Sequence, residues 1–167
     1  MASNPATERT TPCLLNDLGW LLGHASHVLA TEMTAALAPL GLGPRGFCVL
    51  STAQGRELTQ KELAREIGVD KTTLVVTLDE LERRGLVRRA TSSTDRRARV
   101  VCVTDTGAEM VARGRAIVEA VQADVLCTLP ASERETFLSA LRRLAGDRLA
   151  EPVECHGAPR RREPRAA

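Results

Sequence analysis

The sequence predicts a mostly helical fold that carries a small β-ribbon, and three observations lead to this prediction. Aromatic residues are scarce, with one Trp, two Phe and no Tyr in 167 residues, so aliphatic side chains must build the core. Apolar residues recur at helical spacing along most of the chain. Residues that start and stop helices stand where these apolar stripes begin and end. The expected order is four helices, two strands and two more helices.

The first two helices are indicated by an apolar stripe and by a proline. Apolar residues over 14–37 predict a long helix that ends near Pro39. Pro44 follows Gly43 and suits the first position of a helix, because the N–H that proline lacks would be unpaired there in any case. We expect this second helix to end near Ala53.

The next two helices carry clear capping signals. Thr59 and Glu62 form a capping box, in which each side chain bonds the backbone N–H of the other residue. This helix should stop at Gly68, and the following helix should start after Asp70 and end at Gly85. The two helices and the turn between them have the spacing of a helix-turn-helix, which many helical proteins share.

The rest of the chain predicts a ribbon and two further helices. Residues 86–91 and 99–103 are short β-prone runs separated by the polar residues 92–95. Residues 106–109 and 132–135 have the pattern of capping boxes, and each is followed by an apolar stripe. A ribbon directly after a helix-turn-helix is placed like the wing of a winged helix.

Positive charge gathers on the predicted wing. From Arg83 to Arg99 the chain carries seven arginines and one acid, Asp95, a net charge of +6 against +2 for the whole chain. A solvated surface normally mixes signs, whereas an arginine cluster of one sign is typical of phosphate binding. The charge pattern therefore favours a nucleic-acid-binding lobe over a plain soluble hairpin.

The residues of this region resemble one family closely. The run ELAREIGVDKTTLVVTLDELERRGLVRR, followed by STDRRARVVCVTDTG, is similar to the winged-helix core of the multiple-antibiotic-resistance regulator (MarR) family. The similarity runs from Leu58 to Gly107 and includes the Asp-Arg-Arg wing. The flanking helices extend the resemblance to roughly residues 13–150.

The resemblance implies a mostly α (α+β winged helix) fold of six helices with a two-stranded β-wing, assembled as an obligate homodimer. Residues 13–42 and 105–150 would form the helical dimerisation region, and residues 43–104 the DNA-binding lobe. Residues 1–12 and 151–167 are polar and lack periodicity, so we expect a flexible arm and a flexible basic tail. Two lobes would bind a pseudo-palindromic operator in double-stranded DNA, with half-sites about one helical turn apart.

The helix after Asp70 is expected to enter the major groove. At about 100° per residue, one face carries Leu74, Leu78 and Leu81, and the opposite face carries Thr72, Val76, Asp79 and Arg83. Residues expected to contact the major groove are Lys71, Thr72, Thr73, Val76 and Arg83. Many members of the family have a polar residue or arginine in place of Val76. Its methyl groups can contact the methyl group of thymine, or the side chain can pack internally; Val75, on the flank, fits either environment.

The wing residues have separate expected roles. In the family, the arginine at the position of Arg97 reaches the minor groove, where a narrow, electronegative groove favours arginine. Arg96 and Arg99 are expected to meet phosphates. Asp95 is expected to orient a nearby guanidinium.

The resemblance also implies a small anionic or phenolic effector. Trp20, His24 and His27 lie on the first helix and Arg45 opens the second, which together suggest a site for an aromatic acid or phenol that loosens DNA binding. The alternative is a tryptophan at the dimer interface beside solvated histidines.

Redox and zinc sensing are the alternatives of the same fold. In the organic-hydroperoxide subgroup a reactive cysteine stands where this chain has Gly19, and Cys13 lies six residues upstream. His24 and His27 have a workable ligand spacing, yet no further ligand lies nearby in the sequence, so we expect no metal and no cofactor. The five cysteines lack a CxxC pair and are expected to be small buried thiols in a reducing cytoplasm.

Other classes of function lack support in the sequence. An enzyme would need a nucleophile–base arrangement or a metal constellation, and three isolated histidines provide neither, so we expect no catalytic residues. A winged-helix adaptor that binds protein instead of DNA would not need the arginine-rich wing. No signal-peptide core and no run of about 18 apolar residues is present, so we expect a cytoplasmic protein without a membrane partner.

Overall fold

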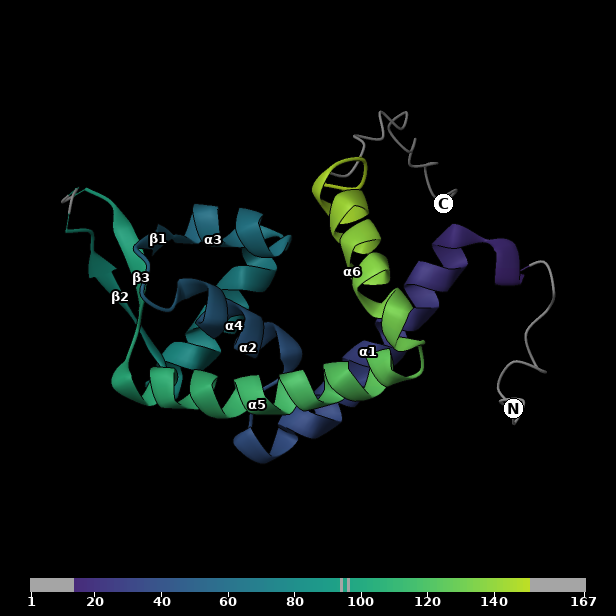
Figure 1. The fold of residues 1–167 in the computed structure, drawn as a ribbon. Coiled ribbons are helices and arrows are strands. Elements are labelled where there is room, and N and C mark those ends of the chain that lie inside the picture. The colour runs from purple at the N-terminus through teal and green to yellow at the C-terminus, as the bar shows by residue number, and fades with distance from the viewer. Residues whose placement is uncertain (1–13, 94, 96, 151–167) are drawn as a thin grey trace, which may run out of the picture. The chain divides into compact units, whose positions relative to one another are not determined.

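A computed structural model describes residues 14–93, 95 and 97–150, which form two compact units. The N-terminal unit, up to Val125, holds the sheet and all helices except the last, and the C-terminal unit begins at Leu126 (Figure 1). The expectations for the arm, the basic tail, Cys13 and Arg96 lie outside the described residues.

The first long helix, α1, spans Leu18–Leu37 and starts later than its apolar stripe. A short 3-10 turn, Leu14–Asn16, precedes it. The helix begins after Asp17 because the Asp17 carboxylate accepts the backbone N–H of Trp20 at 2.6 Å, which satisfies one of the unpaired donors of the first turn. The helix ends as predicted, before a 3-10 turn at Ala38–Leu40 that contains the proline.

The helix-turn-helix forms as predicted. Helix α2 spans Pro44–Ala53, α3 spans Gln60–Ile67 and α4 spans Lys71–Arg83. The capping box is present, with the Thr59 hydroxyl accepting the Glu62 N–H at 3.3 Å and the Glu62 carboxylate accepting the Thr59 N–H at 2.8 Å.

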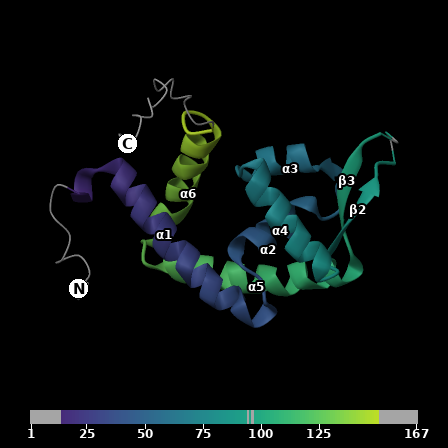
Figure 2. The same cartoon turned by 180° about the vertical axis from the view of Figure 1, so that it is seen from behind.

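The sheet has three strands instead of the two expected. Strands β2, Val87–Thr91, and β3, Arg99–Val103, form the predicted antiparallel hairpin. A two-residue strand β1, Leu58–Thr59, pairs with the other side of β3, so the order is β1-β3-β2. Both views show the hairpin projecting past α3 and α4 at one edge of the N-terminal unit (Figures 1 and 2).

Two predicted capping boxes are wrong. Helix α5 spans Asp105–Cys127 and starts one residue before Thr106, because the hydroxyl of Thr104 accepts the N–H of Gly107 at 3.1 Å and caps the helix first. Helix α6 spans Ala131–Gly146, so Ser132 already lies inside its first turn and no side chain caps it.

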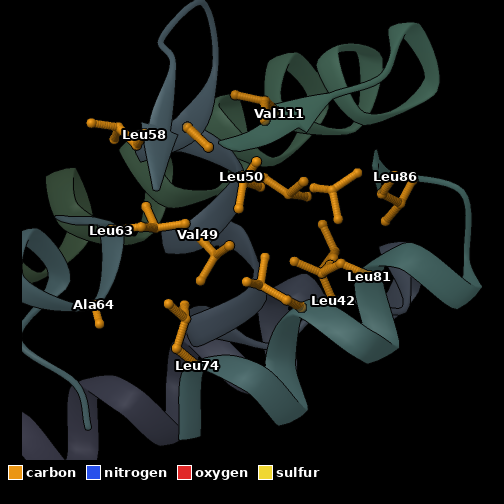
Figure 3. Packing of buried hydrophobic residues seen from close by; sticks show 14 of the residues in the cluster. Leu42, Val49, Leu50, Leu58, Leu63, Ala64, Leu74, Leu81, Leu86 and Val111 are labelled. Atoms are coloured by element: carbon orange, nitrogen blue, oxygen red, sulfur yellow. The ribbon is translucent and has the colours of Figure 1, made fainter. Parts of the chain in front are cut away.

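The core of the N-terminal unit lies between the three helices of the lobe and the sheet. Leucines of α2, α3 and α4 point toward one another and toward the sheet (Figure 3). Side chains at most 1% exposed in this core are Leu37, Val49, Leu50, Ala53, Leu63, Leu74, Leu78, Val101 and Val111. At about 1.5–3 kcal/mol for each large apolar side chain removed from water, this cluster stabilises the lobe and fixes the orientation of α4.

The long helices leave much apolar surface uncovered within one chain. In α1 the first buried residue is Met33, and no residue of α6 is buried. Large apolar side chains that are at least 37% exposed include Leu15, Leu18, Leu21, Val28 and Val125 in the N-terminal unit, and Phe137, Leu141, Leu144 and Leu149 in the C-terminal unit.

The cysteine prediction is wrong for two of the described thiols. Cys48 and Cys127 are exposed, and Cys102 is half-buried. Both exposed thiols lie on helical surfaces that the single chain does not cover. Among the described residues, no single helix has the length and apolar character to cross a membrane, although the bent pair Leu18–Leu40 and Pro44–Ala53 has both when taken together.

Candidate nucleic-acid interface

Helix α4 turns one face to the core and presents the other to solvent. Leu74, Leu78 and Leu81 are 1%, 0% and 2% exposed, whereas Val76 is 65% exposed. The alternative that Val76 packs inside its own chain is therefore wrong. Val75 is half-buried on the flank of the helix. An isolated valine so open to water is available for contact with another molecule.

The start of α4 is held by a well-formed cap. The Asp70 carboxylate accepts the Thr73 hydroxyl at 2.6 Å and the Thr73 backbone N–H at 2.9 Å. These two hydrogen bonds, the hydroxyl first, lower the pKa of Asp70. The hydroxyl hydrogen of Thr73 is thus already donated within the chain, while Lys71 and Thr72 are exposed at the same end of the helix.

The far end of the exposed face carries a paired arginine. Arg83 forms an ion pair with Glu80 at 2.6 Å, with side chains 71% and 51% exposed. An exposed pair of this kind contributes only about 0.2–1 kcal/mol. Arg83 can therefore leave Glu80 for a phosphate at little energetic cost.

The loop end of the wing hairpin is tied to the segment before β1. The Ser92 hydroxyl donates to the Glu57 carboxylate at 2.8 Å and the Ser93 N–H donates to it at 3.1 Å. Hydrogen bonds from the Ser93 hydroxyl, the Ser92 hydroxyl and the Ser93 N–H lower the pKa of Glu57. The sequence did not single out Glu57, since an isolated glutamate carries no recognisable motif.

Asp95 organises the tip of the wing through the backbone. Its carboxylate accepts the N–H of Arg97 at 2.9 Å and its carbonyl accepts the N–H of Ala98 at 2.9 Å. The described contacts of Asp95 thus shape the turn, and the expected contact with a guanidinium stays a prediction. Arg97, within this turn, and Arg99, directly after it, are both exposed.

The arginines of the basic segment fall into two groups. Arg84 donates to the carbonyls of Gly41 at 2.5 Å and Leu40 at 3.0 Å, and Arg89 contacts acids of α4. Among the described residues of this basic segment, the exposed arginines without an ion pair or side-chain hydrogen bond are Arg88, Arg97 and Arg99. Sequence alone did not separate the two groups, because the partners come from other elements.

The predicted effector residues do not meet within one chain. The Trp20 and His24 rings stack with centroids 4.8 Å apart, and His27 is exposed one turn further along α1. Arg45 instead lines an open groove of about 250 Å³ together with Val76. Trp20 precedes the end of α1 by about 25 Å along the helix axis, whereas Arg45 lies beyond that end.

A metal site also lacks support. Within the described ranges, no three His, Cys, Asp or Glu side chains are grouped so that they could hold a metal ion. The zinc alternative therefore rests on the sequence spacing of His24 and His27 alone.

Known proteins share both the sequence and the fold of this chain. A family model described as the MarR family matches residues 40–98. HTH-type transcriptional repressor Rv2887 of Mycobacterium tuberculosis is 35% identical over 131 residues, which cover 78% of this chain and 94% of the relative.

Solved structures extend the similarity over the helices on both sides of the lobe. CouR from Rhodococcus jostii RHA1 bound to p-coumaroyl-CoA has a TM-score of 0.74 and 29% identity, over 86% of this chain and 100% of that chain. Rv2887 in complex with DNA has a TM-score of 0.65 and 33% identity, over 77% and 97%. The chain therefore belongs to the MarR family of transcriptional regulators.

Proposed function

We propose that this protein is a ligand-responsive transcriptional repressor that binds a pseudo-palindromic DNA operator as a homodimer. The observation that carries the proposal is the exposed face of α4, with Val76 at its centre, beside a wing whose exposed arginines lack partners within the described chain. The relatives Rv2887 and CouR are both repressors by name and have been solved with DNA. We assign the protein to the cytoplasm and give it no catalytic role.

A second copy of the chain would cover the apolar faces of the long helices. We assign residues 13–42 and 105–150 to this dimerisation region, and residues 43–104 to the DNA-binding lobe. This assignment is supported by exposed apolar side chains on both helices, namely the leucines and Val28 of α1 and Phe137 and the leucines of α6. Contiguous apolar faces of this kind are uncommon on monomers. Dimerisation sets two copies of α4 on one duplex, with half-sites about one helical turn apart.

In the major groove, Val76 contacts the methyl group of a thymine. Lys71 and Thr72 contact phosphates or base edges at the start of the helix, and Arg83 contacts a phosphate at its end. The hydroxyl hydrogen of Thr73 is donated to Asp70, so its contact is limited to accepting a hydrogen bond. A valine of this exposure reads a methyl group by shape and apolar contact alone.

In the wing, Arg97 enters the minor groove. The turn that Asp95 shapes presents this arginine to solvent, as a minor-groove contact requires. Arg99, and with it Arg96, neutralises phosphates on either side. These contacts supply salt-dependent affinity, and the α4 contacts supply sequence preference.

The effector is a small aromatic acid or phenol. The stacked rings of Trp20 and His24 offer a flat surface for an aromatic ring, with His27 one turn away. Within one chain Arg45 lies beside Val76 and does not meet Trp20. We therefore place Arg45 of the partner chain at this site, where it pairs with the acid group of the effector. The relatives support this ligand class: Rv2887 has been solved with salicylic acid and with p-aminosalicylic acid, and CouR with p-coumaroyl-CoA.

The proposal is tested by binding to the intergenic DNA upstream of the protein's own gene. We expect specific complexes that weaken steeply with salt, and that dissociate when salicylate or a hydroxycinnamate is added. Absence of binding at low salt would leave a protein-binding adaptor as the better description. Binding that no member of an aromatic-acid panel weakens would remove the effector part.

The role of Val76 has its own test. Replacing each thymine of the bound site in turn by uracil removes one methyl group, and we expect weaker binding at one position per half-site. The Val76→Ala variant should be insensitive to that replacement. Equal affinity of the wild-type protein for every uracil-containing duplex would exclude methyl recognition.

A further inference from the structure

One arginine of the wing is tied to the recognition helix. Arg89, on β2, donates from Nη2 to Oδ1 of Asp79 at 2.5 Å and from Nη1 to the carboxylate of Glu82. The backbone N–H of Arg89 also donates to Glu82, at 3.2 Å. Glu82 is thus bound by both the main chain and the side chain of the same residue.

The position of Asp79 makes this contact relevant to DNA. Asp79 follows Val76 by three residues on the exposed face of α4, and its side chain is 60% exposed. A bare carboxylate at this place would face the phosphates of a duplex and repel them at short range. The guanidinium of Arg89 neutralises it, and the contact with Asp79 is the largest cause that raises the pKa of Arg89.

Arg89 itself is turned away from solvent. Its side chain is 29% exposed, whereas the neighbouring Arg88 is exposed and makes no ion pair within the described residues. Successive residues of a strand point to opposite faces, so Arg88 points away from α4 when Arg89 points toward it. The two adjacent arginines therefore differ in what they can contact.

We propose that Arg89 is a positioning residue of the DNA interface, which fixes the wing to α4 and neutralises Asp79 without contacting a phosphate. This proposal rests on the proposed function. It removes Arg89 from the arginines of the basic segment that could bind the DNA backbone. Of the described arginines of the wing, Arg88 and Arg99 remain for phosphates and Arg97 for the minor groove.

The test is a double-mutant cycle in the full-length protein. Affinity for a duplex of the protein's own upstream intergenic DNA is measured for Arg89→Ala, for Asp79→Asn and for the double variant. We expect Arg89→Ala to weaken binding about tenfold, since the dimer loses the contact twice. In the Asp79→Asn background the same change should weaken binding by about threefold or less, because position 79 then carries no charge for Arg89 to neutralise.

Arg88→Ala is the matched control. If Arg88 contacts a phosphate directly, Arg88→Ala should weaken binding by the same factor in the wild-type and the Asp79→Asn background. It should also lower the slope of log Kd against log salt concentration by about 0.9 per phosphate contact removed. Thermal unfolding should separate the two arginines as well, with a lower Tm for Arg89→Ala and an unchanged Tm for Arg88→Ala.

Several results would overturn the role of Arg89. An Arg89→Ala penalty that is equal or larger in the Asp79→Asn background would make Arg89 a direct phosphate contact. A lower Tm with full DNA affinity would make it a purely structural residue. If Arg89→Ala does not stay folded at the assay temperature, the cycle is run with Arg89→Gln, which removes the charge but keeps a hydrogen-bond donor, and is judged by the same comparison. Absence of wild-type binding to this DNA, in contrast, overturns the proposed function itself.

Discussion

Gly107 lies where α5 leaves the sheet, and the structure leaves no space there for a side chain. A Cβ atom at this position would lie 2.1 Å from the carbonyl oxygen of Leu86 and 2.7 Å from Cγ1 of Val103. The Leu86 carbonyl is held in place because it accepts the N–H of Thr104 at 3.0 Å. The Thr104 hydroxyl in turn accepts the N–H of Gly107 at 3.1 Å. The Gly107→Ala substitution must therefore displace the start of α5.

The expected loss of stability follows from these contacts. A shift of about 1 Å would break the two hydrogen bonds at Thr104, at about 1 kcal/mol each, and would add about 1–3 kcal/mol of overpacking. Alanine regains about 1 kcal/mol of helix propensity over glycine. We expect Gly107→Ala to lower the free energy of unfolding by about 2–4 kcal/mol.

Urea denaturation at a fixed protein concentration measures this difference, since the stability of a dimer depends on concentration. The matched control is Gly46→Ala in α2, where the added Cβ would meet its nearest atoms at 3.6 Å, an ordinary contact. We expect that variant to be as stable as the wild type or more stable. If Gly107→Ala matched Gly46→Ala, the reasoning about the α5 junction would be refuted.

Three other predictions concern the lobe. Leu78→Ala should lower the free energy of unfolding by about 2–5 kcal/mol, because Leu78 is 0% exposed. Val76→Ala should lower it by no more than about 0.5 kcal/mol, because Val76 is 65% exposed. Equal effects of the two substitutions in urea denaturation would contradict the orientation of α4. The lowered pKa of Glu57 means that its stabilising contribution is present above its ordinary value of 4.5 and is lost as pH falls through the lowered pKa. Glu57→Gln should therefore lose less stability on acidification than the wild type, and identical pH profiles of unfolding would count against the tie to Ser92. Arg99→Ala should leave Tm unchanged and lower the slope of log Kd against log salt concentration by about 1.8, which is about 0.9 for each of the two contacts that the dimer loses, while an unchanged slope would exclude a phosphate contact.

The apolar faces of the long helices are a part of the molecule that one chain does not explain. The apolar stripes of α1 and α6 were visible in the sequence, and the structure leaves their large side chains exposed. A stripe of this kind shows that something must cover it, because apolar area in water is unfavourable. The sequence does not specify which surface covers this stripe, because that depends on the packing between chains.

Local signals in the sequence predicted the helix-turn-helix well. The box at Thr59 and the cap at Asp70 involve residues three positions apart, so their hydrogen bonds depend only on the nearby chain. The inward face of α4 follows from helical periodicity and three leucines. The same local reasoning was wrong at Thr106, where Thr104 competes for the start of α5 and wins through its contacts with the Gly85 and Gly107 backbones.

The helices of the lobe, the orientation of α4 and the basic wing could be predicted from the sequence. Apolar periodicity, capping residues and clustered arginines are signals that lie within a few residues of one another. Tertiary structure alone decided the pairing of β1 with β3, the separation of Arg45 from Trp20 and the partners of each arginine. Arg88 and Arg89 are identical, adjacent residues in the sequence, yet Arg88 faces solvent and Arg89 forms ion pairs with Asp79 and Glu82. The difference arises because a strand alternates its faces and only the fold determines which face meets α4.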